Sequence, residues 1–294
     1  MKRFFAILLL FTLLFSGCSN ASPPAQVAAT TLPVYEFTSV LCDRTPITVT
    51  RLVTEEVSCL HDYSLNVRQV KAAEAAELIV ISGAGLEEFM HDLLQDAYTI
   101  DASRGISLLC PEESHDHTHE AHGHEGHHHE EDPHIWLSPK NAMTMAENIC
   151  IGLSQSYPQY RTVFEENLAG LLARLEMLQA YGEETLSMLS CRELITFHDG
   201  FAYLADSFGL HILEAVEEES GSEASARELI HLIEIVQRHE LPAIFAERSG
   251  SVSAAGIISR EAGARIYTLD MAMAGDSYFD AMYHNIDTLK EALE

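Results

Sequence analysis

Basic residues are scarce in this chain. Of its 294 residues, 17 are Lys or Arg and 45 are Asp or Glu, which gives a formal net charge of -28 at pH 7. Nucleic acid is therefore not an expected partner, because binding phosphates needs a basic face. An acidic surface raises the local concentration of cations, but it does not identify a ligand.

Two motifs with well-defined chemistry are also absent. The chain has no P-loop, so we do not expect it to hydrolyse a nucleoside triphosphate itself. It has no Cys-x-x-Cys pair either, which argues against a cysteine-built zinc knuckle. After Cys18 the number of cysteines is odd, so at least one thiol is free if disulfides form, and the pairing stays open among Cys42, Cys59, Cys110, Cys150 and Cys191.

Long apolar runs are missing except at the N-terminus. Met1-Lys-Arg precedes an apolar run from Phe4 to Phe15, which has the layout of a secretory signal and is too short for a convincing membrane span. Leu14-Phe15-Ser16-Gly17-Cys18 resembles the bacterial lipobox, whose cleavage leaves a lipid-modified cysteine. We therefore expect a signal peptide ending at a lipidated Cys18, a tether over 19–26, and a location on the extracytoplasmic face of the bacterial cell membrane. Cleavage at another small residue is the alternative.

The remaining length favours two lobes of the α/β class. We expect small, largely parallel sheets flanked by helices, with an N-terminal lobe over 27–138, a helical connector over 139–190 and a C-terminal lobe over 191–294. Pro158 is expected to begin one long, rigid helix that runs to about Leu189 and joins the lobes, with a length of about 50 Å. The predicted strands are Ile47 to Val53, Leu78 to Ser82, Leu194 to Phe197, Ala243 to Ala246 and Arg265 to Leu269.

An acidic, histidine-rich tract extends from Glu112 to Asp132. Imidazole suits zinc and similar transition metals, so the tract indicates auxiliary metal binding more than an incidental low-complexity linker. His124-Glu-Gly-His-His128 matches a metalloprotease pattern, but that chemistry needs a helix, which this glycine-containing tract does not favour. The histidines of the tract, expected to lie in a loop over 112–131, are His115, His117, His119, His122, His124, His127, His128 and His129.

Three further histidines occupy places where ligands collect in α/β folds. His61 follows the first predicted strand, His134 precedes a helix, and His198 ends an apolar strand. Their surroundings resemble the zinc- and manganese-binding solute receptors of bacterial ABC importers. The resemblance rests on Cys59 to Ser64, Asn66 to Leu94, Asp132 to Pro139, Thr196 to Leu210 and Leu269 to Leu289.

The resemblance implies a metal site in the cleft between the lobes. It makes His61, His134 and His198 ligands, with Asp270 or water as the fourth, and a histidine at position 198 favours zinc because manganese receptors usually carry glutamate there. It also makes the histidine-rich tract a weak collector of zinc. The chain departs from the family after Tyr63, where members commonly have a proline.

This ligand set is chemically consistent. Three neutral imidazoles and one carboxylate give Zn²⁺ a closed tetrahedral shell, which suits carrying an ion better than catalysis. Ligating histidines commonly donate their second ring N–H to a neighbouring acceptor. Candidates for that acceptor are Asp62, Asp132, Asp199 and Glu247, although each is more readily explained as a solvated or capping residue.

The resulting hypothesis is a monomeric, lipid-anchored zinc receptor, not an enzyme, that delivers Zn²⁺ to an ABC permease and, through it, to its ATPase. The alternatives are a manganese or iron receptor of the same family and an extracellular zinc buffer or adhesion lipoprotein. A zinc hydrolase is a further alternative, and it would need an open coordination position.

Overall fold

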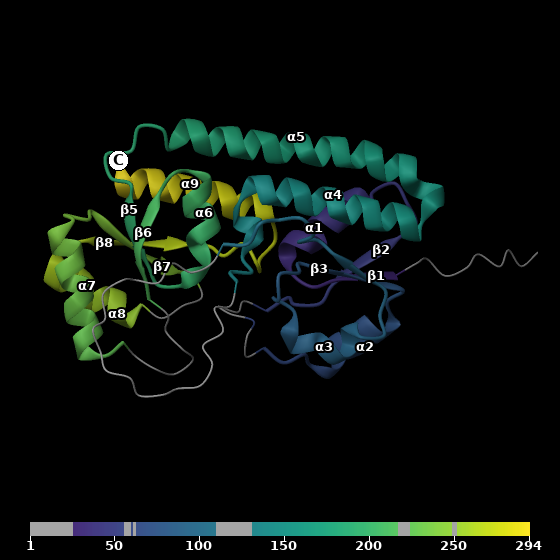
Figure 1. The fold of residues 1–294 in the computed structure, drawn as a ribbon, viewed down its shortest axis with the longest axis horizontal. Helices are drawn as coiled ribbons and strands as arrows, with labels where there is room; N and C mark the ends of the chain where they lie inside the picture. The colour runs from purple at the N-terminus through teal and green to yellow at the C-terminus, as the bar shows by residue number, and fades with distance from the viewer. Residues whose placement is uncertain (1–25, 56–59, 61–62, 110–130, 217–223, 249–251) are drawn as a thin grey trace, which may run out of the picture.

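A computed structural model of the chain describes residues 26–55, 60, 63–109, 131–216, 224–248 and 252–294. Within them the chain forms two four-stranded sheets in which every pair of strands is parallel. Helices flank both sheets, so the expected two-lobe α/β class is confirmed (Figure 1). None of the described helices is both long and apolar enough to cross a membrane.

The N-terminal lobe is built on the first sheet, in the order β2-β1-β3-β4. Its central strands β1 and β3 contain the most deeply buried side chains of the sheet, as continuous apolar runs typical of parallel strands covered on both faces. The strands are β1 (Gln26–Ala29), β2 (Thr48–Arg51), β3 (Leu78–Ile81) and β4 (Thr99–Asp101); the helices are α1 (Leu32–Leu41), α2 (Val67–Ala75), the 3-10 turn η1 (Glu88–Met90) and α3 (His91–Leu94).

The C-terminal lobe repeats this plan with the order β6-β5-β7-β8. Its most buried strand is β7, in which all five residues are buried. The strands are β5 (Glu193–Thr196), β6 (His211–Ala215), β7 (Ala243–Glu247) and β8 (Arg265–Leu269); the helices are the 3-10 turn η4 (Asp199–Phe201), α6 (Ala202–Ser207), α7 (Ala226–Arg238), α8 (Ser253–Ala262) and α9 (Tyr278–Leu293).

Between the two sheets the chain is helical. The 3-10 turn η2 (Ile135–Leu137) leads into α4 (Pro139–Ser156). The helical structure is interrupted at Tyr157, and η3 (Pro158–Tyr160) then leads into α5 (Arg161–Thr185). Pro158 thus starts a 3-10 turn rather than the α-helix, and α5 ends before Leu189, because its last turn closes at Leu186. Its 25 residues span about 38 Å, so the expected length of about 50 Å was too large.

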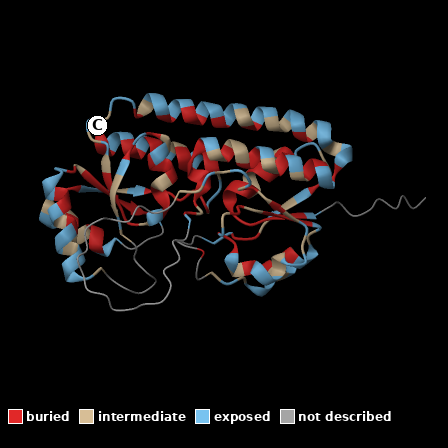
Figure 2. Cartoon of the chain, viewed as in Figure 1, coloured by how far each residue is buried: buried red, intermediate tan, exposed pale blue. Residues whose placement is uncertain are grey.

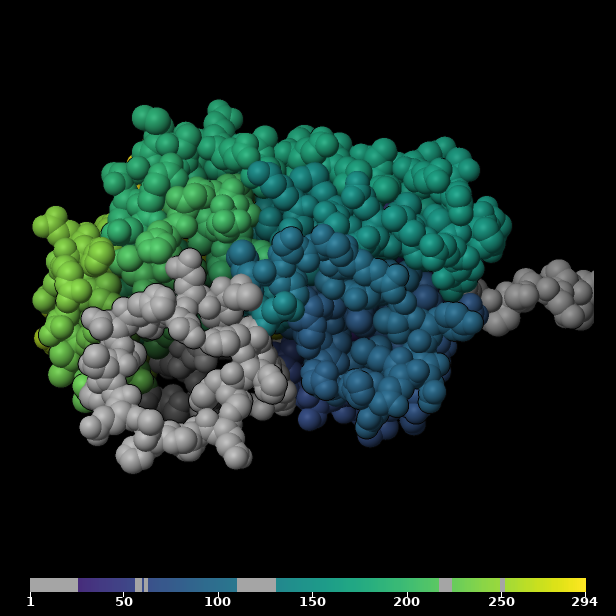
Figure 3. All heavy atoms as spheres, in the orientation of Figure 1, coloured from purple at the N-terminus to yellow at the C-terminus, as the bar shows by residue number. Residues whose placement is uncertain are grey.

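Helix α5 contacts α1 and α4 on the N-terminal side and α9 on the C-terminal side, so it packs on both lobes (Figure 1). Figure 3 shows the blue N-terminal lobe and the green C-terminal lobe side by side beneath the teal layer of α4 and α5. Buried residues line the inner sides of these helices (Figure 2). One continuous core cluster includes Val80, Trp136, Leu171 and Phe245, and therefore extends through both lobes.

Candidate metal centre between the lobes

His134 is held by a buried carboxylate. It lies just before η2, and its ring Nδ1 is 2.8 Å from Asp132 Oδ1, which also accepts the backbone N–H of His134 at 2.8 Å. Both side chains are at least nine-tenths buried. A proton on Nδ1 shared with this carboxylate leaves the Nε2 lone pair available to a metal ion. The expectation that Asp132 is solvated or a simple cap is therefore wrong, because the residue is buried against His134.

His198 lies at the carboxyl end of β5, with 12% of its side chain exposed. Its Nδ1 accepts the Gly200 backbone N–H at 2.8 Å and is 3.2 Å from Asp199 Oδ1. These two contacts need opposite states of Nδ1, because accepting from Gly200 requires a free lone pair whereas donating to Asp199 requires a proton. Only the second state frees Nε2 for a metal ion, and Asp199 is in place to favour it.

The imidazole of His134, just before η2, and that of His198, at the end of β5, meet edge to face. Their ring centroids are 5.2 Å apart at an interplanar angle of 88°. A Cβ atom added to Gly200 would lie 2.8 Å from His134 Nδ1, so a side chain at this position would press on the His134 ring. Trp136 packs against another side of the His134 ring, with the two ring centroids 5.4 Å apart.

Asp270 follows β8 and is also buried. Its Oδ1 accepts the Ala272 N–H at 2.8 Å, and its Oδ2 accepts from Arg248 Nη1 at 2.6 Å. The next residue, Met271, accepts the Trp136 indole N–H at 2.7 Å through its carbonyl oxygen. The loop after β8 thus packs against the segment that carries His134. Arg248 was not predicted, although its place directly after β7, at the ligand-binding edge of the sheet, was a usable signal.

Several expected site residues lie outside the described residues. These are His61, the whole set of tract histidines at 115, 117, 119, 122, 124, 127, 128 and 129, and the lipidation site Cys18. Within the described ranges, no group of three or more His, Cys, Asp or Glu side chains is arranged so that it could hold a metal ion. The structure therefore brings His134 and His198 together, and the four-ligand set stays a prediction. The five histidines discounted from the sequence are exposed, namely His91, His211, His231, His239 and His284.

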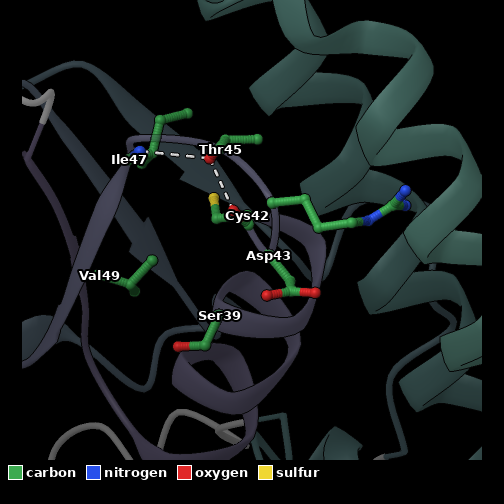
Figure 4. A pocket seen from close by; sticks show the side chains of 7 residues that line it. Ser39, Cys42, Asp43, Thr45, Ile47 and Val49 are labelled. Atoms are coloured by element: carbon green, nitrogen blue, oxygen red, sulfur yellow. Dashed lines mark hydrogen bonds between the residues drawn. The ribbon is translucent and has the colours of Figure 1, made fainter.

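A separate hollow lies beside the start of the edge strand β2 in the N-terminal lobe. It is lined by the end of α1, the turn that follows it and the start of β2, including Cys42, Asp43 and Thr45 (Figure 4). Burial raises the pKa of the Cys42 thiol to about 12, so this thiol stays protonated and is a poor metal ligand. The described cysteines Cys42, Cys150 and Cys191 are all free thiols. This hollow is not a candidate metal centre.

Comparison with known proteins extends over nearly the whole chain. At the sequence level, the chain is 29% identical to a putative metal-binding protein of Treponema pallidum, over 95% of this chain and 92% of that protein. It is 30% identical to the zinc-binding lipoprotein AdcA of Streptococcus pneumoniae over 97% of this chain, but it spans only 60% of that longer protein. Among solved structures, ZnuA superposes with a TM-score of 0.78 at 28% identity, covering 92% of this chain and 100% of that one.

A family model matches residues 27–292, which include both sheets and the described helices except for the first residue of β1 and the last of α9. The model is described as "Zinc-uptake complex component A periplasmic", and a match of this extent, together with the relatives above, shows that this chain belongs to that family.

Proposed function

We propose that this protein is an extracytoplasmic zinc receptor of an ABC importer, which captures Zn²⁺ between its two lobes and delivers it to a membrane permease. The observation that carries the proposal is the meeting of the His134 and His198 imidazoles at a centroid distance of 5.2 Å. Membership of a zinc-uptake family and the zinc-binding name of the AdcA relative support zinc as the transported ion.

The proposed ligands are His61, His134, His198 and Asp270. Zinc binds imidazole nitrogens at about 2.0 to 2.1 Å in a tetrahedral shell, and one carboxylate partly neutralises the dication. The Asp132 contact supports the role of His134, because it directs the Nε2 lone pair away from the carboxylate. Asp270 would have to share its carboxylate with Arg248, which already pairs with Oδ2 at 2.6 Å.

Binding and release, rather than catalysis, is the activity that such a site supports. The matched family is one of uptake receptors and not of enzymes. A shell filled by four protein ligands has no open position for a substrate or an activated water molecule. The ion would instead be the cargo, held until the receptor meets its permease and the ATPase that powers transport.

The setting of this activity is also part of the proposal. Lipidation at Cys18 would anchor the receptor to the outer face of the cell membrane, and the AdcA relative is itself named a lipoprotein. We assign residues 27–138 to the N-terminal lobe, 139–190 to the connector and 191–294 to the C-terminal lobe, and we expect the receptor to act as a monomer. The histidine-rich tract would serve as a weak auxiliary collector, because wrapping a loop around an ion costs chain entropy.

Zinc affinity of single variants tests the proposal. His134→Ala and His198→Ala should each weaken zinc binding by at least about 100-fold, since even residues that only support a ligand are worth 10–100-fold. His231→Ala is the matched control, because this histidine is half exposed and pairs with Glu214 at 3.3 Å. Competition against a chromophoric chelator measures all three. Unchanged zinc affinity in both His134→Ala and His198→Ala would refute the proposed site.

A further inference from the structure

Tyr203 belongs to the C-terminal lobe, yet its hydroxyl bonds to the segment that carries His134. The residue lies on α6, with 3% of its surface exposed. Its hydroxyl accepts the backbone N–H of Leu109 at 2.9 Å and donates to the backbone carbonyl of Asp132 at 2.9 Å. One side chain therefore joins α6 to two chain segments of the N-terminal half.

The same two segments are also bonded to each other. The backbone N–H of Asp132 donates to the carbonyl of Leu109 at 3.0 Å. Leu109, Asp132 and the Tyr203 hydroxyl thus form a closed triangle of three hydrogen bonds, in which each member is bonded to the other two. Buried polar groups of this kind are costly to leave unpaired, so the triangle fixes the backbone position of Asp132 relative to α6.

The position of Asp132 in turn determines that of the His134 ring. Asp132 Oδ1 accepts from both the backbone N–H and the Nδ1 of His134. The other oxygen, Oδ2, is buried and has no hydrogen-bond partner in the described part of the chain. The His134 bonds are therefore the ones that orient this carboxylate, and a shift of the Asp132 backbone would move the ring with it.

Tyr203 is five residues from His198 along the chain, in the segment that turns through η4 into α6. This short segment thus carries both the His198 imidazole and the hydroxyl that bonds to the backbone of Asp132, the residue that holds the His134 ring. We propose that Tyr203 is a positioning residue of the zinc site, whose hydroxyl aligns His134 with His198 by holding the backbone of Asp132. This inference rests on the proposed function, because it assumes that both histidines bind zinc.

Tyr203→Phe removes the hydroxyl and keeps the ring. We expect the variant to bind zinc about threefold to tenfold more weakly, in line with the loss of buried hydrogen bonds that support a ligand. Tyr181→Phe is the matched control, since its hydroxyl donates to Asp287 Oδ1 at 2.6 Å on the exposed side of α5. Melting of the metal-free proteins must be measured alongside, because a purely structural role would lower the melting temperature without changing zinc affinity.

A double-mutant cycle with Asp132→Ala tests the route of the effect. If Tyr203 acts through Asp132, adding Tyr203→Phe to Asp132→Ala should change zinc affinity by less than twofold further, so the two effects are not additive. Visible absorption of Co²⁺-loaded protein gives a second readout, and Tyr203→Phe should alter the spectrum while Tyr181→Phe should not. Wild-type zinc affinity in Tyr203→Phe, or additive effects in the cycle, would overturn the inference. Absence of a tight zinc site in the wild-type protein would instead refute the proposed function.

Discussion

Arg248 Nη1 lies 2.6 Å from Asp270 Oδ2, so a guanidinium already pairs with the carboxylate that is expected to be the fourth zinc ligand. The two residues follow the neighbouring strands β7 and β8, whose register pairs Glu247 with Leu269. Asp270 keeps 12% of its side chain exposed, whereas Arg248 keeps 63%. An ion that binds Asp270 must therefore share this carboxylate with the guanidinium or displace it.

Replacing this arginine should strengthen zinc binding. Arg248→Gln removes a positive charge that competes with the dication for Asp270. Because the arginine is largely exposed, the gain should be only a few-fold, in keeping with the roughly 0.2–1 kcal/mol of exposed ion pairs. Asp270→Asn should weaken binding in the same titration. A loss in Arg248→Gln as large as that in Asp270→Asn would mean that the arginine positions the carboxylate instead of competing for it.

The buried carboxyl of Glu87 predicts a pH-dependent stability. Glu87 accepts from Thr30 Oγ1 at 2.6 Å and from the backbone N–H groups of Ser82 and Gly83, but burial dominates and raises its pKa to about 7 from 4.5. Between those two values the native protein holds a proton that the unfolded chain has lost. The contribution of Glu87 to stability is thus complete below about pH 4.5 and is lost as the pH rises through about 7.

Urea unfolding at pH 5 and pH 8 measures this contribution. The fall in the free energy of unfolding between the two conditions should be smaller in Glu87→Gln than in the wild type, by on the order of 1–3 kcal/mol. Glu88→Gln, at the exposed neighbouring carboxyl, should behave like the wild type. Only the change of the unfolding free energy with pH is compared between variants. The absolute stability of Glu87→Gln also changes, because its new amide N–H₂ faces the backbone N–H groups of Ser82 and Gly83. Equal falls in Glu87→Gln and Glu88→Gln would contradict the prediction.

Trp136 should report zinc binding through its fluorescence. It is the single tryptophan of the chain, it is fully buried, and its ring centroid lies 5.4 Å from that of His134. A metal ion on His134 changes the electric field at the indole, so the emission should change and saturate at one equivalent of Zn²⁺ in protein lacking residues 113–131. His134→Ala should abolish the change. A response that survives in this variant would place the bound zinc elsewhere.

Five of the eight strands in the described part of the chain were predicted from short runs rich in apolar and β-branched residues. The five predicted strands correspond to β2, β3, β5, β7 and β8, with ends that agree to within a few residues. The missed strands are β1, β4 and β6. Strand β1 has only four residues and adjoins the expected tether, and β4 has only three, so both are too short to show a period. Strand β6 is at the sheet edge and has no buried residue.

The candidate site was predicted where a local motif marks it, and missed where distant segments meet. His134 and His198 were both identified from short motifs, and the structure brings their rings together. Tyr203 and Arg248 were not, because their contacts to Asp132 and Asp270 join residues 71 and 22 positions apart. Such pairs depend on how elements distant in the sequence pack together, which periodicity along the chain does not encode.

The most direct test is a competitive titration of Zn²⁺ and Mn²⁺ into metal-free mature protein from which Glu113 to Glu131 have been deleted. The deletion removes the tract histidines and keeps His61, His134, His198 and Asp270. We predict one tight zinc site from which excess manganese does not displace the ion. Weak binding of both metals would contradict a cleft receptor and would move metal binding to the histidine-rich tract, as expected of an extracellular zinc buffer.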